Sequence, residues 1–157
     1  MLLFSWLAAC GDSGADADGP AKTDGTADTG PLTVELVDVG TACARGEAAA
    51  DPAETTFPGD APFEVSVELA DCASGCASDI EVGCDVRLVG GEIVVSASAS
   101  WSEPRGNPVC PLSCTAVVAI CPGPELAPGY WGLDYAGGHS DGFTVPATIP
   151  VPCATAP

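Results

Sequence analysis

Basic residues are scarce in this chain. Four Lys and Arg residues stand against 22 Asp and Glu residues, which gives a formal net charge of −18. Proteins that bind nucleic acid need a basic surface to displace counterions from phosphates, so this charge argues against nucleic-acid partners. It argues equally against electrostatic docking on anionic lipid. An acidic surface favours solubility and attracts cations or basic partners.

Large side chains are scarce as well. The 157 residues include only three Trp, four Phe and two Tyr. The length allows one domain, whose core will be modest and will benefit from covalent cross-links.

Long hydrophobic runs are absent as well, and the apolar stretch at the N-terminus extends only from Leu2 to Ala9. A membrane-spanning helix needs about 20 residues, so this run is typical of a signal segment instead.

The apolar run ends in Leu7-Ala8-Ala9-Cys10. This tetrapeptide resembles the lipobox of bacterial lipoproteins. The resemblance implies a signal segment at residues 1–9, lipidation of Cys10, and a membrane partner held through that lipid anchor. It also implies a location in the bacterial cell envelope. Gly11 follows the Cys where an Asp would favour the inner membrane, so the outer membrane is expected, with the domain facing the periplasm or the surface.

Residues 10–31 are expected to comprise the lipidated Cys and a flexible acidic tether. After Cys10 the segment consists almost wholly of Gly, Ala, Asp, Thr, Ser and Pro, which cannot offset the entropy of ordering. Asp16-Ala17-Asp18-Gly19 faintly echoes a calcium loop. The third ligand and the closing Glu of that loop are missing, which favours a solvated spacer over a calcium site.

Residues 32–157 show the alternation of apolar and polar residues that is typical of strands, without helical periodicity. The sequence therefore predicts an all-β, disulfide-rich β-sandwich of about seven strands. In the strand at 33–39 the phase slips between Leu36 and Val37, which predicts a bulge. Gly90-Gly91 predicts a hairpin turn. The remaining strands are expected at 63–69, 80–88, 93–101, 115–120, 131–135 and 143–145. The odd-numbered apolar residues of 63–69 and 93–101 and the even-numbered apolar residues of 80–88 are expected to face the core.

The segment Leu126-Ala127-Pro128-Gly129-Tyr130-Trp131-Gly132-Leu133, followed by Phe143-Thr144-Val145-Pro146, resembles the closing hairpin of bacterial immunoglobulin-like modules. The resemblance covers about 20 residues and implies an immunoglobulin-like scaffold. A scaffold of this kind carries no function of its own.

Eight cysteines remain once Cys10 is set aside, and an even number in an exported domain predicts a disulfide framework. Their connectivity is left open because eight cysteines allow 105 pairings. Two Cys-x-x-x-Cys pairs also allow a zinc site, which an oxidising compartment disfavours. The eight are Cys43, Cys72, Cys76, Cys84, Cys110, Cys114, Cys121 and Cys153.

Gly138-His139-Ser140-Asp141-Gly142 matches the Gly-x-Ser-x-Gly elbow of α/β-hydrolases. The elbow needs a His well downstream of the Ser, and the only His of this chain is adjacent to it, so we predict a polar hairpin turn and no catalytic residue. Asp134, His139 and Asp141 in the same loop are weak candidates for a cation site. Neither a hydrolase nor a redox protein is favoured.

A long acidic linker is expected between the first two clear strands, at residues 40–62. Its Glu47, Asp51, Glu54 and Asp60 could bind calcium or a basic partner. The favoured interpretation is a non-catalytic envelope lipoprotein with a binding or structural β module, which has no cofactor and an unknown envelope protein or polysaccharide as partner. The alternative is a module that binds calcium or another cation through its acidic loops.

Overall fold

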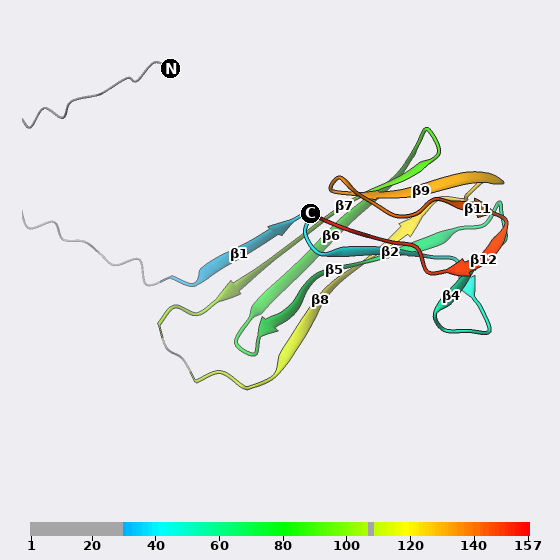
Figure 1. Ribbon diagram of the computed structural model, residues 1–157. Coiled ribbons are helices and arrows are strands. Elements are labelled where there is room, and N and C mark those ends of the chain that lie inside the picture. Colours follow the sequence, from blue (N-terminus) through cyan, green and yellow to red (C-terminus); the bar gives the residue numbers. More distant parts are fainter. Residues whose placement is uncertain (1–29, 107–108) are drawn as a thin grey trace, which may run out of the picture.

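The computed structural model describes residues 30–106 and 109–157, and these residues form thirteen strands and no helix (Figure 1). The all-β prediction is confirmed. The predicted signal segment, Cys10 and the tether up to residue 29 lie outside the described residues. The strands are β1 (Leu32–Val37), β2 (Thr41–Arg45), β3 (Glu47–Ala48), β4 (Glu54–Phe57), β5 (Phe63–Ser74), β6 (Ser78–Val89), β7 (Glu92–Glu103), β8 (Cys114–Gly123), β9 (Gly129–Tyr135), β10 (Gly138–His139), β11 (Phe143–Val145), β12 (Ala147–Pro150) and β13 (Cys153–Thr155).

The largest sheet is built around β7. One edge of β7 pairs antiparallel with β6 along almost its whole length, through the predicted turn at Gly90 and Gly91, which both have positive φ. The other edge is shared: β1 pairs antiparallel with residues 98–103, and β9 pairs parallel with residues 92–95. β9 in turn pairs with β10 and β11. Two strands from opposite ends of the chain therefore lie along one edge of β7.

The second sheet has four antiparallel strands in the order β13-β2-β5-β8. A small third sheet, in the order β12-β4-β3, lies at the right-hand end of the molecule in Figure 1. The segment 40–62, expected to be an acidic linker, therefore contains β2, β3 and β4, and that prediction was wrong. Thr55 is buried there at 2% exposure, and its hydroxyl finds partners because it accepts a hydrogen bond from Gly46 N and donates to Glu47 O.

The inward faces of both large sheets contribute to one hydrophobic core. Alternate residues of β5 and β7 are buried, as the sequence pattern predicted, and a further set comes from β8 and β9. Phe57 of β4 stacks on Phe143 of β11 with ring centroids 4.9 Å apart and meets Phe63 edge-on. Ala is frequent among the buried residues of both sheets. The buried residues of β5 and β7 are Phe63, Val65, Val67, Leu69, Ala73, Ile93, Val95, Ala97, Ala99 and Trp101.

The eight cysteines form four disulfides, which confirms the predicted framework. Cys84–Cys121 joins β6 of one sheet to β8 of the other, so it fixes the two sheets to each other. The remaining pairs are Cys43–Cys153, Cys72–Cys114 and Cys76–Cys110. These assignments leave none of the eight as a free thiolate for the zinc alternative.

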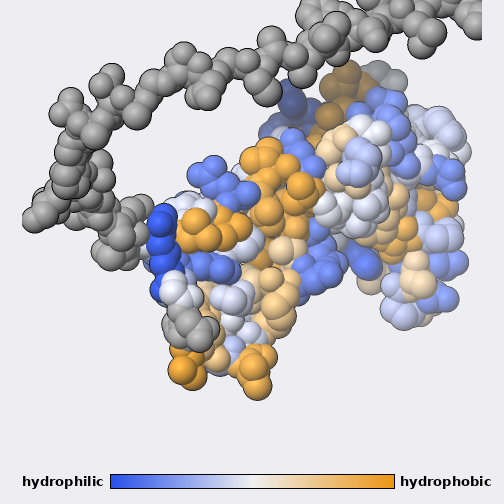
Figure 2. Space-filling view, turned by 60° about the vertical axis from the view of Figure 1, so that its left-hand side comes forward, coloured by the Kyte–Doolittle hydropathy of each residue, from blue (hydrophilic) through white to orange (hydrophobic). Residues whose placement is uncertain are grey.

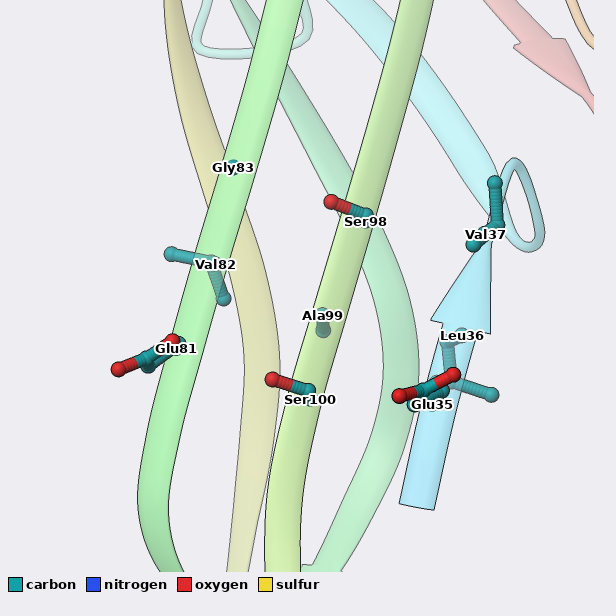
Figure 3. A pocket seen from close by; sticks show the side chains of 9 residues that line it. All are labelled: Glu35, Leu36, Val37, Glu81, Val82, Gly83, Ser98, Ala99 and Ser100. Atoms are coloured by element: carbon teal, nitrogen blue, oxygen red, sulfur yellow. The ribbon is translucent and has the colours of Figure 1, made fainter. Parts of the chain in front are cut away.

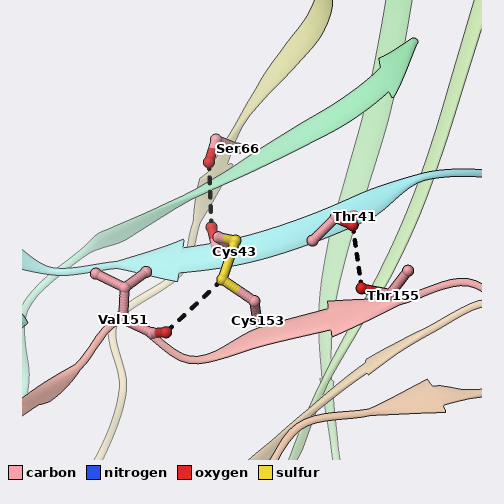
Figure 4. Close-up of a disulfide and its surroundings, with 6 residues drawn as sticks. All are labelled: Thr41, Cys43, Ser66, Val151, Cys153 and Thr155. Atoms are coloured by element: carbon pink, nitrogen blue, oxygen red, sulfur yellow. Dashed lines mark hydrogen bonds between the residues drawn. A yellow bond between two sulfur atoms is a disulfide. The ribbon is translucent and has the colours of Figure 1, made fainter. Parts of the chain in front are cut away.

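Cys43 and Cys153 face each other directly across the β2–β13 ladder, with their Cα atoms 4.1 Å apart (Figure 4). Two residues further along the same pair of strands, the hydroxyls of Thr41 and Thr155 lie 3.0 Å apart and share a hydrogen bond. The short C-terminal strand is therefore held to the sheet covalently as well as by its ladder.

Two details of the predicted strands were wrong. The expected bulge at Leu36 and Val37 does not occur, because both residues continue the regular β1–β7 register. Val37 is simply 65% exposed on the outer face at the end of the strand. In β6, Ile80 and Val82 are exposed although the pattern placed them inward. Alternation shows which side chains of a strand lie on the same face, but it does not show whether another element covers that face.

Candidate functional site

A shallow hollow of about 360 Å³ lies on the outer face of the sheet formed by β1, β7 and β6 (Figure 3). The alternation that buries Ala97, Ala99 and Trp101 turns the serines between them outward along β7. A neighbouring hollow of about 400 Å³ continues along the same face toward Ser96. We call the two together the serine trough.

The strand register explains why this face is hollow. Glu35 of β1 and Glu81 of β6 both lie opposite Ser100 of β7, one on each side. In the next outward row, Val37 and Gly83 lie opposite Ser98. A central strand of short side chains between longer flanking ones gives a groove. Gly83 lowers one wall, and its missing side chain leaves the Ser98 hydroxyl accessible.

The floor of the serine trough offers unused hydrogen-bonding groups. Among the described residues, the hydroxyls of Ser96, Ser98 and Ser100 have no hydrogen-bond partner. A hydroxyl can both donate and accept, and the flanking carboxylates of Glu35 and Glu81 accept only. Along the β6 side, the Asp85 carboxylate pairs with Arg87 at 3.0 Å, with both side chains well exposed. The trough is therefore an acid-rimmed surface with hydroxyls on its floor and no aromatic residue in its lining.

The end of β1 borders this trough and is fixed by two residues of the larger sheet. Asp38 has a φ of 50°, and its backbone N donates to Ala97 O while its carboxylate accepts from Ala97 N, both at 2.8 Å. Beneath it, the buried Tyr135 hydroxyl donates to Val39 O. Burial, and secondarily the charge of Asp38, raise the pKa of Tyr135 to about 12. These hydrogen bonds attach the end of β1 to β7 and β9.

The weak cation-site candidates are only partly brought together. His139 Nδ1 lies 3.9 Å from Asp134 Oδ1, across the β9–β10 pair. The same Asp134 oxygen already accepts a hydrogen bond from Gly137 N. Asp141 is exposed beyond β10, and the structure shows no hydrogen bond or ion pair from its carboxylate to either residue. Within the described part of the chain, no three His, Cys, Asp or Glu side chains are grouped so that they could hold a metal ion.

Ser140 of the Gly-x-Ser-x-Gly motif has a structural role. Its hydroxyl accepts a hydrogen bond from Leu133 N at 3.2 Å and donates to Asp141 O at 3.1 Å. The motif runs from β10 toward β11, and both strands pair with β9, so it lies inside a hairpin and not between a strand and a helix. The predicted hairpin between Tyr135 and Phe143 is present, but the chain reverses at Ala136 and Gly137, ahead of the motif, and Gly138 and His139 belong to β10.

The serine trough was only half visible in the sequence. The outward serines of β7 follow from the alternation, but nothing in the sequence places Glu35 and Glu81 beside them. That arrangement depends on β1 and β6 lying on opposite edges of β7, which is a matter of register.

Comparison of this chain with protein-family models, with curated proteins and with solved structures found no match. No helix within residues 30–106 or 109–157 is long and apolar enough to cross a membrane.

Proposed function

We propose that this protein is a bacterial envelope lipoprotein, anchored through an acylated Cys10 to the outer membrane, whose immunoglobulin-like β-sandwich is a non-catalytic binding module. The serine trough is its binding surface. The observation that carries the proposal is the row of outward Ser98 and Ser100 hydroxyls, with the carboxylates of Glu35 and Glu81 on either side of Ser100.

The disulfides support export. Four disulfides in one small domain are typical of proteins that mature in an oxidising compartment, and cytosolic thiols stay reduced. All eight cysteines after Cys10 are paired. Cys10 is thereby the one cysteine of the chain that the framework does not use, which agrees with its proposed role as the lipid attachment point.

Two observations support a sandwich. Both large sheets place alternate residues in a common core, and Cys84–Cys121 ties one sheet to the other. The antiparallel pairing of β9 with β11 agrees with the closing hairpin on which the resemblance to immunoglobulin-like modules rests. Such scaffolds commonly carry their ligand surfaces on an exposed sheet face or on the loops.

The chemistry of the trough favours a polysaccharide as ligand. Sugar hydroxyls can donate to carboxylates and exchange hydrogen bonds with serine hydroxyls, and Val37 offers a small apolar wall for C–H groups. Carboxylates repel anionic chains, so neutral or amino-bearing polysaccharides fit best. Glu35 and Glu81 are both exposed, so both can reorient toward a ligand.

The trough is tested by titrating neutral and amino-bearing polysaccharide fragments into the full chain and following backbone amide shifts by NMR. Binding should shift the amides of β1, β6 and β7, and Ser98→Val with Ser100→Val, which fills the floor, should weaken it at least tenfold. Thr144→Val, on the exposed side of β11, is the matched control and should leave binding unchanged. Shifts confined to other strands would overturn the assignment. Equivalent shifts with calcium alone would favour the cation-binding alternative.

The anchor is tested separately by the mass of membrane-extracted protein. Acylation should add a lipid-sized increment to the chain that begins at Cys10, and Cys10→Ser should abolish the increment and release the protein from membranes. If the Cys10→Ser protein still sediments with membranes, the lipid anchor is not what holds it there.

A further inference from the structure

Two apolar side chains protrude at one end of the molecule. Val109 and Leu112, in the segment between β7 and β8, are fully exposed, at 101% and 107% of the reference area. Figure 2 shows apolar surface projecting at the lower tip of the described molecule. Cys110 lies between them and is bonded to Cys76 in the β5–β6 turn, so the loop is fixed to the sheets. The exposed pair therefore lies in a loop that a disulfide attaches to the β5–β6 turn.

The loop that carries this pair has no Asp or Glu. Residues 104–124 contain no Asp or Glu, although the chain as a whole has a net charge of −18. The acidic residues near the loop are Glu103 at the end of β7, and Asp71 and Asp79 on either side of the β5–β6 turn. Carboxylates are costly to take out of water, so a loop without them can approach a bilayer at a lower desolvation cost than a face rimmed by carboxylates.

The chain enters the described domain at the same end. Leu32, the first residue of β1, pairs with Glu103, the last residue of β7, and the loop with Val109 begins immediately after Glu103. The 29 residues ahead of the described part, which include Cys10, join the domain here through Gly30. The opposite end of β7 leads to the Gly90–Gly91 hairpin, far from this junction in Figure 1.

We infer that Val109 and Leu112 dock on the headgroup region of an uncharged bilayer, the same bilayer that holds the lipid on Cys10. The inference rests on the proposed lipid anchor. Burying a Val or Leu side chain shifts a partition equilibrium by roughly tenfold or more. Two such side chains add little to the membrane affinity that an acyl anchor provides, but they determine which end of the domain faces the membrane.

The test uses the full acylated chain in phosphatidylcholine vesicles with a photo-crosslinking phenylalanine analogue at position 112. A second variant carries the same analogue at position 89, since Val89 is 59% exposed in the β6–β7 hairpin at the opposite end. Irradiation should give a lipid adduct, seen by mass, at position 112 and little at position 89. Equal adducts at both positions, or adducts between two protein chains at position 112, would overturn the inference.

A second measurement separates this inference from the anchor. The Cys10→Ser chain is mixed with phosphatidylcholine vesicles at high lipid concentration, and the bound fraction is measured by flotation. Val109→Ser with Leu112→Ser should lower the partition coefficient at least tenfold, and Val89→Ser should not change it. If the protein with Cys10 intact carries no acyl increment, but the tenfold difference in partition coefficient is found, only the lipid anchor is contradicted. If that protein carries the increment, but the variants partition equally, only the docking of Val109 and Leu112 is contradicted.

Discussion

The Tyr135 hydroxyl donates a 2.7 Å hydrogen bond to the carbonyl oxygen of Val39, a residue 96 positions earlier in the chain. The contact links the middle of the largest sheet to the segment between β1 and β2. Tyr135 is fully buried, and it is one of the largest side chains that the core encloses. It connects the hydrophobic interior with the backbone that supports the serine trough.

Tyr135 should make stability depend on alkaline pH. Its pKa is raised from 10.0 to about 12, first by burial and then by Asp38. The unfolded state loses its phenolic proton earlier than the folded state, so this contribution to stability is complete below pH 10 and is lost as pH rises toward 12. The loss should amount to about 2–3 kcal/mol. Absorbance titration of Tyr130→Phe, in which Tyr135 is the only tyrosine left, should give a midpoint near 12.

The control for this effect is the double variant Tyr130→Phe with Tyr135→Phe. It should lose about 1 kcal/mol at neutral pH, because the hydrogen bond to Val39 is removed. Between pH 10 and 12 its free energy of unfolding should fall less steeply than that of Tyr130→Phe. Parallel curves for the two proteins would mean that Tyr135 ionises as easily folded as unfolded.

The disulfides should differ in the stability that they contribute. Cys43–Cys153 closes a loop with a sequence separation of 110, whereas Cys84–Cys121 closes one of 37. The other bridges shorten both loops, so in the chain-entropy account removing the first should cost about 4 kcal/mol and removing the second about 3 kcal/mol. Urea unfolding of the two paired Cys→Ala variants, with the other bridges intact, measures both. A larger loss for the 84–121 variant would show that holding the sheets together outweighs loop entropy.

Gly40 should tolerate no side chain. It has a φ of 85°, and a Cβ added there would overlap the backbone oxygen of Glu68. Gly40→Ala should therefore destabilise the protein by more than about 2 kcal/mol, since the backbone conformation alone costs about 1–2. Gly137→Ala is the matched control, with a φ of 82° and open space around its Cβ position. Thermal unfolding should place the control between wild type and Gly40→Ala; equal losses would exclude the steric part.

Thr55→Val should destabilise the protein despite its near-identical shape. The Thr55 hydroxyl is the only hydrogen-bond partner that the structure shows for Gly46 N in this part-buried site, at 2.8 Å. Valine would leave that N–H without a partner, at a cost of about 1–3 kcal/mol. Thr148→Val, whose hydroxyl pairs with Thr56 on the exposed side, should cost much less. Chemical denaturation compares the two variants, and similar losses would show that water replaces the lost partner of Gly46.

Local patterns in the sequence were sufficient for the central strands. The alternation in β5 and β7 and the paired glycines at 90–91 correctly placed a buried face and a turn, because these features depend only on neighbouring residues. The short strands β2, β3 and β4 were missed, since the stretch is rich in Ala and acidic residues. Their pairing depends on partners far along the chain, such as β12 and β13.

Long-range relations were beyond the sequence. The pairings of the cysteines, such as that of Cys84 with Cys121, follow from how the two sheets are stacked. The trough required Glu35 and Glu81 to meet the same serine, and strand register between segments 46 residues apart in the chain is set by the whole fold. Among the proposed cation ligands, Asp134 and His139 adjoin through a local hairpin, which proximity in sequence could indicate.

The pairing of β1 with the end of β7 determines how the domain would respond to pulling. A force applied to the chain ahead of residue 30, along the strand axis, loads the six residue pairs of the β1–β7 ladder in shear, so that they resist together. If β1 is torn away, the covalent bridge between Cys43 and Cys153 stops further unravelling, because everything between these residues is a closed loop. The extension gained from the domain is then limited to the short stretch before Cys43. Under tension the domain would therefore lengthen by a small fixed amount when β1 detaches and would then resist further extension.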